Sequence, residues 1–273
     1  MSGFVIGTDA SKDASTMFLK TDIEKWVSDG DTVSSEICAL LVGKPKTGKS
    51  GIALDSRTEE EKKEGKKIIV IELNSDNGCK LNKKVHHKND PNIIVLDPRE
   101  FSINETTGDW TFDYVKTMGK IKALIIWIKE NKDRIKLKTI VFDGADVFLS
   151  EICEGQMRID ENIDVAGGVQ QRYWKKRNTY FYDVMNMLFT IDVDKYIITH
   201  FKTNETTQKE EYAIQKNFPD KVSQIIEFHK DGNKFYAKLT DDRRALKADT
   251  YNKDVVIAEI TDDGKTIWNG FKL

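Results

Sequence analysis

Eight residues in the first fifth of the chain have the types and the spacing of a phosphate-binding loop. They run Gly43-Lys44-Pro45-Lys46-Thr47-Gly48-Lys49-Ser50 and are followed by Gly51. Glycines let main-chain N–H groups point inward at phosphate oxygens. In this motif the lysine, Lys49, reaches the terminal phosphates and the hydroxyl of Ser50 binds Mg²⁺. The motif therefore predicts that residues 43–51 bind the phosphates of a nucleotide.

The residues on either side have the patterns of the elements that such a loop needs. Residues 37–42 form an unbroken apolar run, which is typical of a parallel strand buried on both faces. Residues 50–63 have the pattern of one charged amphipathic helix that ends before Gly65. A helix that begins at the loop directs the positive end of its dipole at the phosphates. This context makes a chance glycine-rich turn the weaker interpretation.

Buried strands and helices alternate through the rest of the chain. We expect strands at residues 68–71, 92–96, 139–142 and 196–199, and helices at 112–132 and 170–189. This rhythm predicts an α/β fold with a mostly parallel, doubly wound sheet. After about residue 222, short strands flank the turns Asp231-Gly232-Asn233 and Asp262-Asp263-Gly264. They predict an antiparallel C-terminal extension of the same sheet.

Length and composition indicate one large nucleotide-binding domain. The chain has 273 residues, of which 39% are hydrophobic and 32% charged, and these values exclude a disordered chain. We expect an N-terminal extension, residues 1–35, packed on a core domain of residues 36–273. Three separated cysteines, a start without a secretion pattern and short apolar runs predict a cytoplasmic protein with no membrane partner. With a net charge of −2, any nucleic-acid binding must come from local patches.

A second acid stands where a metal site requires one. Asp143 ends the apolar strand at residues 139–142 and could hold the water shell of Mg²⁺. Ser50 and Asp143 are therefore the predicted metal residues. The next residue is Gly144, whereas helicases and AAA-type motors usually place a catalytic glutamate there.

From residue 37 to residue 244 the order of these elements resembles the RecA-like P-loop ATPases. Residues 139–148 are similar to that family's pattern of an apolar strand, an aspartate, a small residue and a helix start. The resemblance implies Mg²⁺-dependent hydrolysis of ATP between the subunits of a homo-oligomeric ring or filament. It also implies a water-activating acid at the end of the strand that follows the loop helix. Glu72 is the first candidate and Asp76 is its rival.

Two further elements resemble family features. His200 follows the strand at residues 196–199, and the resemblance implies that it couples hydrolysis to a DNA-facing loop. Arg243 and Arg244 resemble the element that reaches the nucleotide of a neighbouring subunit; the alternative is that they are surface arginines at the end of a hairpin. Lys49, Glu72, Asp143 and His200 are thus the predicted catalytic residues.

Two polar segments, residues 154–171 and 201–219, fall where the family has its DNA-binding loops. Residues 172–177, Arg-Tyr-Trp-Lys-Lys-Arg, combine cations and aromatic rings in a way that suits single strands. The alternative is that Tyr173, Trp174, Arg177 and Phe181 cover the buried face of a helix. The nearest resemblance is to phage-type and archaeal-virus-type ATPases of single-strand annealing or recombination. It implies DNA-stimulated hydrolysis on single-stranded DNA in recombination, repair or replication of a phage or other mobile element.

Three alternatives stay open. A small-molecule or nucleotide kinase would carry an arginine-rich lid. A DNA packaging or translocation motor would usually carry a glutamate beside Asp143. A nucleotide-gated binding module would bind ATP and Mg²⁺ without turnover. A GTPase is disfavoured because no Asn-Lys-x-Asp motif follows a later strand.

Overall fold

The computed structural model describes residues 36–103, 108–164, 167–204, 206–243, 251–263 and 265–271. The extension predicted at residues 1–35 lies outside these ranges, so the division into extension and core stays a prediction. Among the helices within them, none is long and apolar enough to cross a bilayer.

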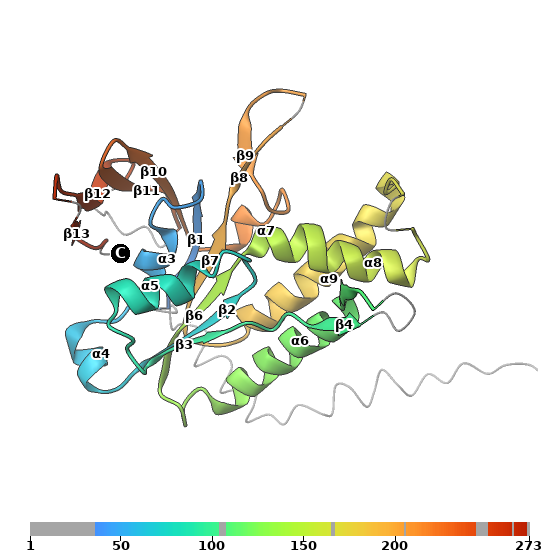
Figure 1. Ribbon diagram of the computed structural model, residues 1–273, viewed down its shortest axis with the longest axis horizontal. Coiled ribbons are helices and arrows are strands. Elements are labelled where there is room, and N and C mark those ends of the chain that lie inside the picture. The colour runs from blue at the N-terminus through green and yellow to red at the C-terminus, as the bar shows by residue number, and fades with distance from the viewer. Residues whose placement is uncertain are drawn as a thin grey trace, which may run out of the picture. The chain divides into compact units, whose positions relative to one another are not determined.

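A nine-stranded sheet lies at the centre of the domain, in the order β13-β12-β11-β10-β1-β7-β6-β2-β3. The parallel part comprises β1 (Cys38–Gly43), β2 (Lys67–Glu72), β3 (Ile93–Leu96), β6 (Leu137–Asp143), β7 (Asp194–Thr199) and β10 (Gln224–Asp231). The antiparallel part adds β11 (Lys234–Asp242), β12 (Asp254–Ile260) and β13 (Thr266–Trp268). The predicted α/β class and the antiparallel C-terminal extension are both confirmed (Figure 1).

Helices cover the two faces of this sheet (Figure 1). One apolar layer lies under α6 (Tyr114–Asn131) and α9 (Gln171–Phe189), the other under α3 (Lys49–Leu54) and α5 (Gly78–His86). In β1, Leu40 packs in the first layer and Leu41 in the second, because successive side chains of a strand point to opposite faces. Burial on both faces explains why the strands read as unbroken apolar runs.

The helix expected at residues 50–63 is two helices, and the prediction of one was wrong. α3 ends at Leu54, and α4 (Glu59–Lys63) begins after Thr58. The Thr58 hydroxyl accepts the N–H of Glu61, and the Glu61 carboxylate accepts the N–H of Thr58. This reciprocal cap begins a new helix, and its signal was hidden in a run of charged residues.

The two polar segments, expected to be loops, each contain a regular element, whereas the described residues between 161 and 170 form no helix or strand. A helical run begins with α7 (Ala145–Val147), continues as the π-helical turn η1 (Phe148–Cys153) and ends as α8 (Glu154–Asp160). Between residues 201 and 219, β8 (Phe201–Thr203) pairs with β9 (Glu210–Tyr212). The expectation failed because polar exposed faces hide both elements. The sequence also did not predict α5, η2 (Pro219–Lys221), or β4 (Phe101–Ile103) with β5 (Trp110–Phe112).

The C-terminal extension touches the helix that follows the phosphate-binding loop. A Cβ atom added at Gly51 would lie 2.6 Å from Cη2 of Trp268 in β13. The Trp268 indole N–H donates to Oδ2 of Asp55, at 3.2 Å. A side chain at position 51 would therefore have to displace the indole ring, which packs on the first turn of α3 and is hydrogen-bonded to the residue that ends this helix.

Candidate nucleotide site

The phosphate-binding loop has the predicted strand–loop–helix geometry. β1 ends at Gly43 and α3 begins at Lys49. Gly48 has a φ of 98°, a left-handed conformation that favours glycine. At Gly43 a Cβ atom would lie 2.6 Å from the main-chain oxygen of Phe228. The left-handed backbone therefore explains the glycine at position 48, and the close packing against Phe228 explains the glycine at position 43.

Lys49 is held inside this loop. The residue is 5% exposed, and its Nζ donates to the main-chain oxygens of Gly43 and Lys44, at 2.8 Å each. Burial lowers the pKa of Lys49 to about 8, although the carboxylates of Asp143, Asp146 and Asp76 act in the opposite direction. Phosphate oxygens entering the loop would replace these carbonyl partners and favour the ammonium form.

This lowered pKa predicts that ATP binding weakens above pH 8. Below pH 8 the Lys49 amine of the free protein is already protonated, which is the form that binds phosphate. Above pH 8 the amine is mostly neutral, so ATP binding must be accompanied by the uptake of a proton. We expect the Kd for ATP to rise up to about tenfold per pH unit above 8. Calorimetry in buffers of different ionisation enthalpy should show little proton uptake near pH 7 and uptake close to one proton at about pH 9. Equal uptake at both pH values would contradict it.

The Asp143 carboxylate is buried at the end of β6, 2% exposed, beside the loop. Its Oδ2 lies 3.3 Å from the Ser50 hydroxyl and 2.9 Å from the Cys79 thiol, which both donate to it. Its Oδ1 accepts the side-chain N–H of Asn74, at 2.7 Å. A hydroxyl and a carboxylate this close form the hard oxygen set that Mg²⁺ prefers, so Ser50 and Asp143 fit the predicted metal site.

The two candidate water-activating acids differ in position. Glu72 is fully buried, and its Oε1 accepts the main-chain N–H groups of Cys79 (2.6 Å) and Lys80 (3.4 Å). Burial raises its pKa. Glu72 thus caps the first turn of α5, a helix start that supplies free N–H groups. Asp76 lines the cavity over the loop, and its Oδ1 accepts the N–H of Gly78.

That cavity has a volume of about 370 Å³ and lies at the carboxyl ends of the parallel strands. α5 forms one wall with the exposed side chains of Leu81 and Val85. Loop residues Lys46, Thr47, Gly48, Lys49, Ser50 and Gly51 line it, together with Asn74, Asp76, Asp143 and His200. The structure therefore brings the loop, Asp143, His200 and Asp76 together in one cavity, and Glu72 is not among its lining residues in the described part of the chain.

His200 stands between β7 and β8 at the edge of this cavity. Its Nδ1 lies 2.8 Å from Oδ2 of Asp146 on α7. Gly144, which leads into α7, has a φ of 97°, a left-handed conformation that favours glycine, and a Cβ there would make a tight contact of 3.0 Å with Oδ1 of Asn74. The Gly144 turn thus places Asp146 against His200.

A family model described as an AAA domain matches residues 35–232. The chain belongs to this AAA-domain family. Together with the phosphate-binding loop and Asp143, this match makes the chain a P-loop ATPase of AAA type. Among solved structures, the chain is similar to a KaiC-like protein from the hyperthermophilic archaeon Pyrococcus horikoshii OT3, at 13% identity and a TM-score of 0.46, over 84% of this chain and 88% of that one. No curated protein matches the chain.

Two arginines, Arg243 and Arg244, were predicted to act on the nucleotide of a neighbouring subunit. Arg243 does not line the nucleotide cavity of its own chain. Arg243 follows β11, and its guanidinium donates to the main-chain oxygen and, at 3.2 Å, to Oδ1 of Asp220. Arg244 lies outside the described residues. A role in a second subunit stays a prediction for both.

Three residues around the nucleotide cavity of the AAA domain were missed by reading the sequence: Asn74, Cys79 and Asp146. Cys79 lies in α5, a helix with too few apolar residues to be recognised. One available signal was the pair Asn77-Gly78, since Asn77 takes the left-handed conformation just before α5. Lys44 was expected in the loop, but its ion pair with Glu210 of β9, at 2.8 Å, was not.

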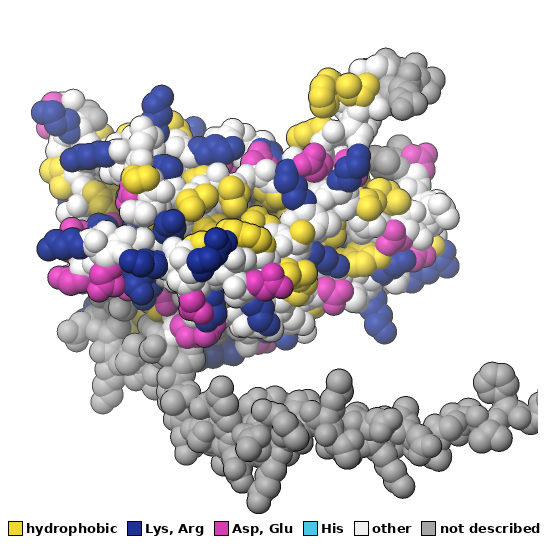
Figure 2. Space-filling view, turned by 90° about the horizontal axis from the view of Figure 1, so that it is seen from below, with side chains coloured by type: hydrophobic (Ala, Val, Ile, Leu, Met, Phe, Trp, Pro, Cys, Tyr) yellow, Lys and Arg dark blue, Asp and Glu magenta, His cyan; other side chains and the backbone are white. Residues whose placement is uncertain are grey.

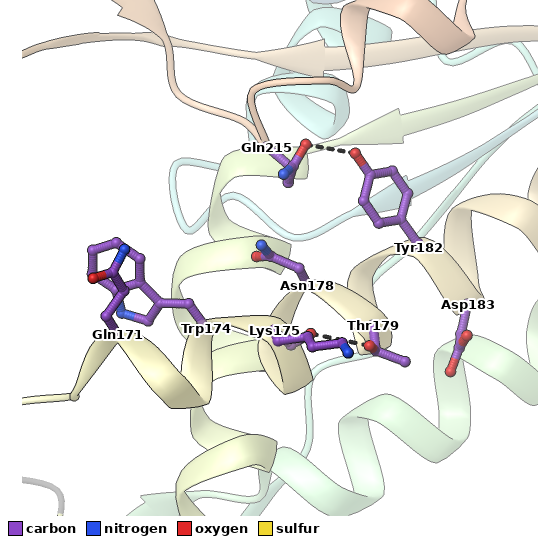
Figure 3. A pocket seen from close by; sticks show the side chains of 8 residues that line it. All are labelled: Gln171, Trp174, Lys175, Asn178, Thr179, Tyr182, Asp183 and Gln215. Atoms are coloured by element: carbon purple, nitrogen blue, oxygen red, sulfur yellow. Dashed lines mark hydrogen bonds between the residues drawn. The ribbon is translucent and has the colours of Figure 1, made fainter.

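A groove runs along α9 of the AAA domain. Figure 3 shows Trp174, Lys175 and Asn178 on α9 and the hydroxyl of Tyr182 directed at Gln215, to whose Oε1 it donates at 2.5 Å. An adjoining cavity of about 1050 Å³ shares Trp174, Asn178 and Gln215. It continues over Phe201 and Lys202 of β8 and Tyr212 of β9. Its lining also includes Arg177 of α9, Asp146 of α7 and Lys216.

The residues expected either to bind single strands or to cover a buried face of α9 lie in two environments. Trp174 is 45% exposed and lines the groove, and the Arg177 guanidinium lies 5.7 Å from the centre of its ring. Phe181, about two turns further along α9 than Trp174, is fully buried in the core. The alternative of a wholly buried face therefore holds for Phe181 and fails for Trp174.

Proposed function

We propose that this AAA domain hydrolyses ATP with Mg²⁺ while bound to single-stranded DNA, in recombination, repair or replication of a phage or other mobile element. The observation that carries the DNA part is the groove along α9, which reaches Asp146 and thereby the nucleotide cavity. We propose that the chain works as a homo-oligomeric ring or filament, in which Arg243 or Arg244 reaches the ATP of a neighbour.

The ATP part rests on the contacts within the nucleotide cavity. Lys49 binds the terminal phosphates, and Ser50 and Asp143 hold Mg²⁺, which neutralises phosphate charge when bound. Asp76 is the acid that lines the cavity, and the carboxylates of Asp76 and Asp143 both act on the Lys49 ammonium. This position favours Asp76 over the buried Glu72 as the group that orients the attacking water.

The groove has the chemistry that single strands require. Trp174 and Tyr212 offer ring faces to bases, and Lys175, Arg177, Lys202 and Lys216 offer cations to phosphates. Glu210, Glu211 and Glu227 also line it. On the face shown in Figure 2, basic and acidic side chains are likewise interspersed. Mixed charge favours modest affinity that depends on stacking as well as on salt.

One hydrogen bond connects the two sites. His200 lines the nucleotide cavity, Asp146 lines the groove, and their side chains are 2.8 Å apart. A change at the γ-phosphate that moves His200 would therefore move Asp146 and the start of the helical run that it begins. This pair supports the proposal that DNA in the groove stimulates hydrolysis.

The test is the rate of ATP hydrolysis with and without an unstructured single-stranded oligonucleotide, at about 50 and about 200 mM salt. We expect stimulation by DNA that weakens as salt rises. Turnover that is indifferent to every nucleic acid would overturn the DNA part and favour a kinase. Stimulation by duplex with directional translocation would favour a packaging motor.

Trp174→Ala should weaken binding of single strands about tenfold, because a base–aromatic stack contributes ~1–3 kcal/mol. Hydrolysis without DNA should stay unchanged. The matched control is Trp127→Ala, which removes a ring of similar exposure from α6 (44% against 45%). Fluorescence anisotropy with a labelled oligonucleotide measures both. Equal losses for the two variants would show that the groove is not the binding site.

The subunit arrangement can be tested by mixing two inactive variants. Lys49→Ala removes the phosphate-binding cation, and Arg243→Ala with Arg244→Ala removes the candidate arginines of the neighbour. If ATP binds between subunits, a mixture should recover part of the hydrolysis that neither variant has alone. No recovery, in a mixture shown to co-assemble, would count against a role in trans.

A further inference from the structure

We propose that Cys79 is a positioning residue of the ATPase site, where it fixes the metal-binding carboxylate of Asp143 and joins it to the buried carboxylate of Glu72. The inference rests on the proposed ATP hydrolysis and adds to it a residue that touches neither phosphate nor water. No part of it requires thiol chemistry, because the sulfur acts only as a hydrogen-bond donor.

Cys79 contacts both acids through different atoms. Its main-chain N–H donates to Oε1 of Glu72 at 2.6 Å, and its thiol donates to Oδ2 of Asp143 at 2.9 Å. Glu72 and Asp143 pair with each other across β2 and β6. One atom from each of the three side chains lies within 4.8 Å of the others, and all three residues are buried. A single residue at the start of α5 thus bridges the ends of two neighbouring strands.

The donors around Asp143 leave its carboxylate one orientation. Asn74 binds Oδ1, and Cys79 and Ser50 both bind Oδ2. A Ser50 hydroxyl that held Mg²⁺ through its oxygen could still donate its proton to Oδ2 of Asp143. The Cys79 thiol gives that oxygen a second donor, which is buried and would hold the carboxylate whether or not the Ser50 contact is kept.

A neutral donor suits this position for an electrostatic reason. A buried carboxylate without donors is costly, and a lysine or arginine in place of Cys79 would repel the incoming Mg²⁺. A thiol satisfies one oxygen without adding charge. Glu72 holds the Cys79 thiol in place indirectly. Its Oε1 accepts the main-chain N–H groups of Cys79 and Lys80 and so anchors the first turn of α5.

The test compares Cys79→Ala, which removes the donor, with Cys79→Ser, which keeps one. We expect Cys79→Ala to raise the Mg²⁺ concentration for half-maximal hydrolysis about tenfold, the loss expected for one hydrogen bond to a charged group. Cys79→Ser should restore it to within about threefold. Binding of ATP in the presence of a chelator, which depends on the loop, should be unchanged in both.

The matched control is Cys153→Ala. Cys153 is also fully buried, but it packs in the other apolar layer, under α6 and α9. It should lose a similar amount of thermal stability without changing the Mg²⁺ requirement. If Cys79→Ala and Cys153→Ala shift that requirement equally, or if Cys79→Ser behaves like Cys79→Ala, Cys79 has only a packing role and the proposal fails.

A spectroscopic measurement keeps the proposal testable if Cys79→Ala does not fold. The S–H stretch of a thiol bound to a carboxylate lies below that of the other thiols, and the lowest band should disappear in Cys79→Ser. It should also shift when Mg²⁺ and ATP bind; no shift would overturn the proposal. Failure of this proposal can be distinguished from failure of the proposed function. Equal hydrolysis by wild type and Lys49→Ala would reject the ATPase site itself. Hydrolysis that depends on Lys49 but has a normal Mg²⁺ requirement in Cys79→Ala would reject only the role of Cys79.

Discussion

Lys49→Ala should reduce ATP hydrolysis by at least about 10²-fold, the loss typical of removing one preorganised donor from a charged transition state. The Nζ of Lys49 already lies inside the loop, held by the carbonyls of Gly43 and Lys44, and needs no reorganisation to meet phosphate oxygens. Steady-state kinetics with Mg²⁺ and a parallel measurement of the unfolding temperature are sufficient to check it.

The control for this variant is Lys46→Ala. Lys46 belongs to the same loop and lines the same cavity, but its side chain is exposed. We expect only a few-fold change, since an exposed ammonium is screened by water. Full hydrolysis in Lys49→Ala would reject the loop as the catalytic phosphate site, whatever Lys46→Ala does.

Asp76→Asn should lower kcat by about 10²–10⁴-fold and leave ATP binding nearly intact, because a group that orients and deprotonates water acts on the transition state. Glu72→Gln should have the smaller effect on kcat. The amide keeps an oxygen acceptor for the N–H groups of Cys79 and Lys80, so we expect a loss of about 1 kcal/mol in the free energy of unfolding.

Both variants should be compared by single-turnover kinetics and by binding of a nonhydrolysable ATP analogue. If Glu72→Gln abolishes turnover and Asp76→Asn does not, Glu72 is the water-activating acid, as the sequence first suggested. In that case the cavity must open toward β2 when nucleotide binds.

The parts of the fold that could be predicted have strong local signals. Strands buried on both faces read as unbroken apolar runs, which is why β1, β2, β6 and β7 were recognised. The phosphate-binding loop has fixed spacing, so its residues could be assigned one by one. Asp143 was expected because it ends a buried strand near the loop, and His200 because the resemblance to RecA-like ATPases implies a polar residue there; both side chains line the nucleotide cavity.

The parts that could not be predicted depend on contacts between distant residues. α5 contains three lysines and a single fully buried residue, Cys79, so its sequence looks like a surface loop. The burial of Glu72 arises because α5 places N–H groups over it, which only the folded chain shows. In the β8–β9 hairpin only Phe201 and Tyr212 are apolar, and they pair with each other and pack against the core, a contact between strands that a mostly polar sequence does not show.

The contact of Trp268 with Gly51 has a consequence for how the protein is made. The indole hydrogen bond to Asp55 joins residues 213 positions apart in the chain. A ribosome delivers the phosphate-binding loop first and the ring that packs on its helix only 213 residues after Asp55. Until residue 268 is made, the first turn of α3 therefore lacks the ring that packs on it in the finished sheet.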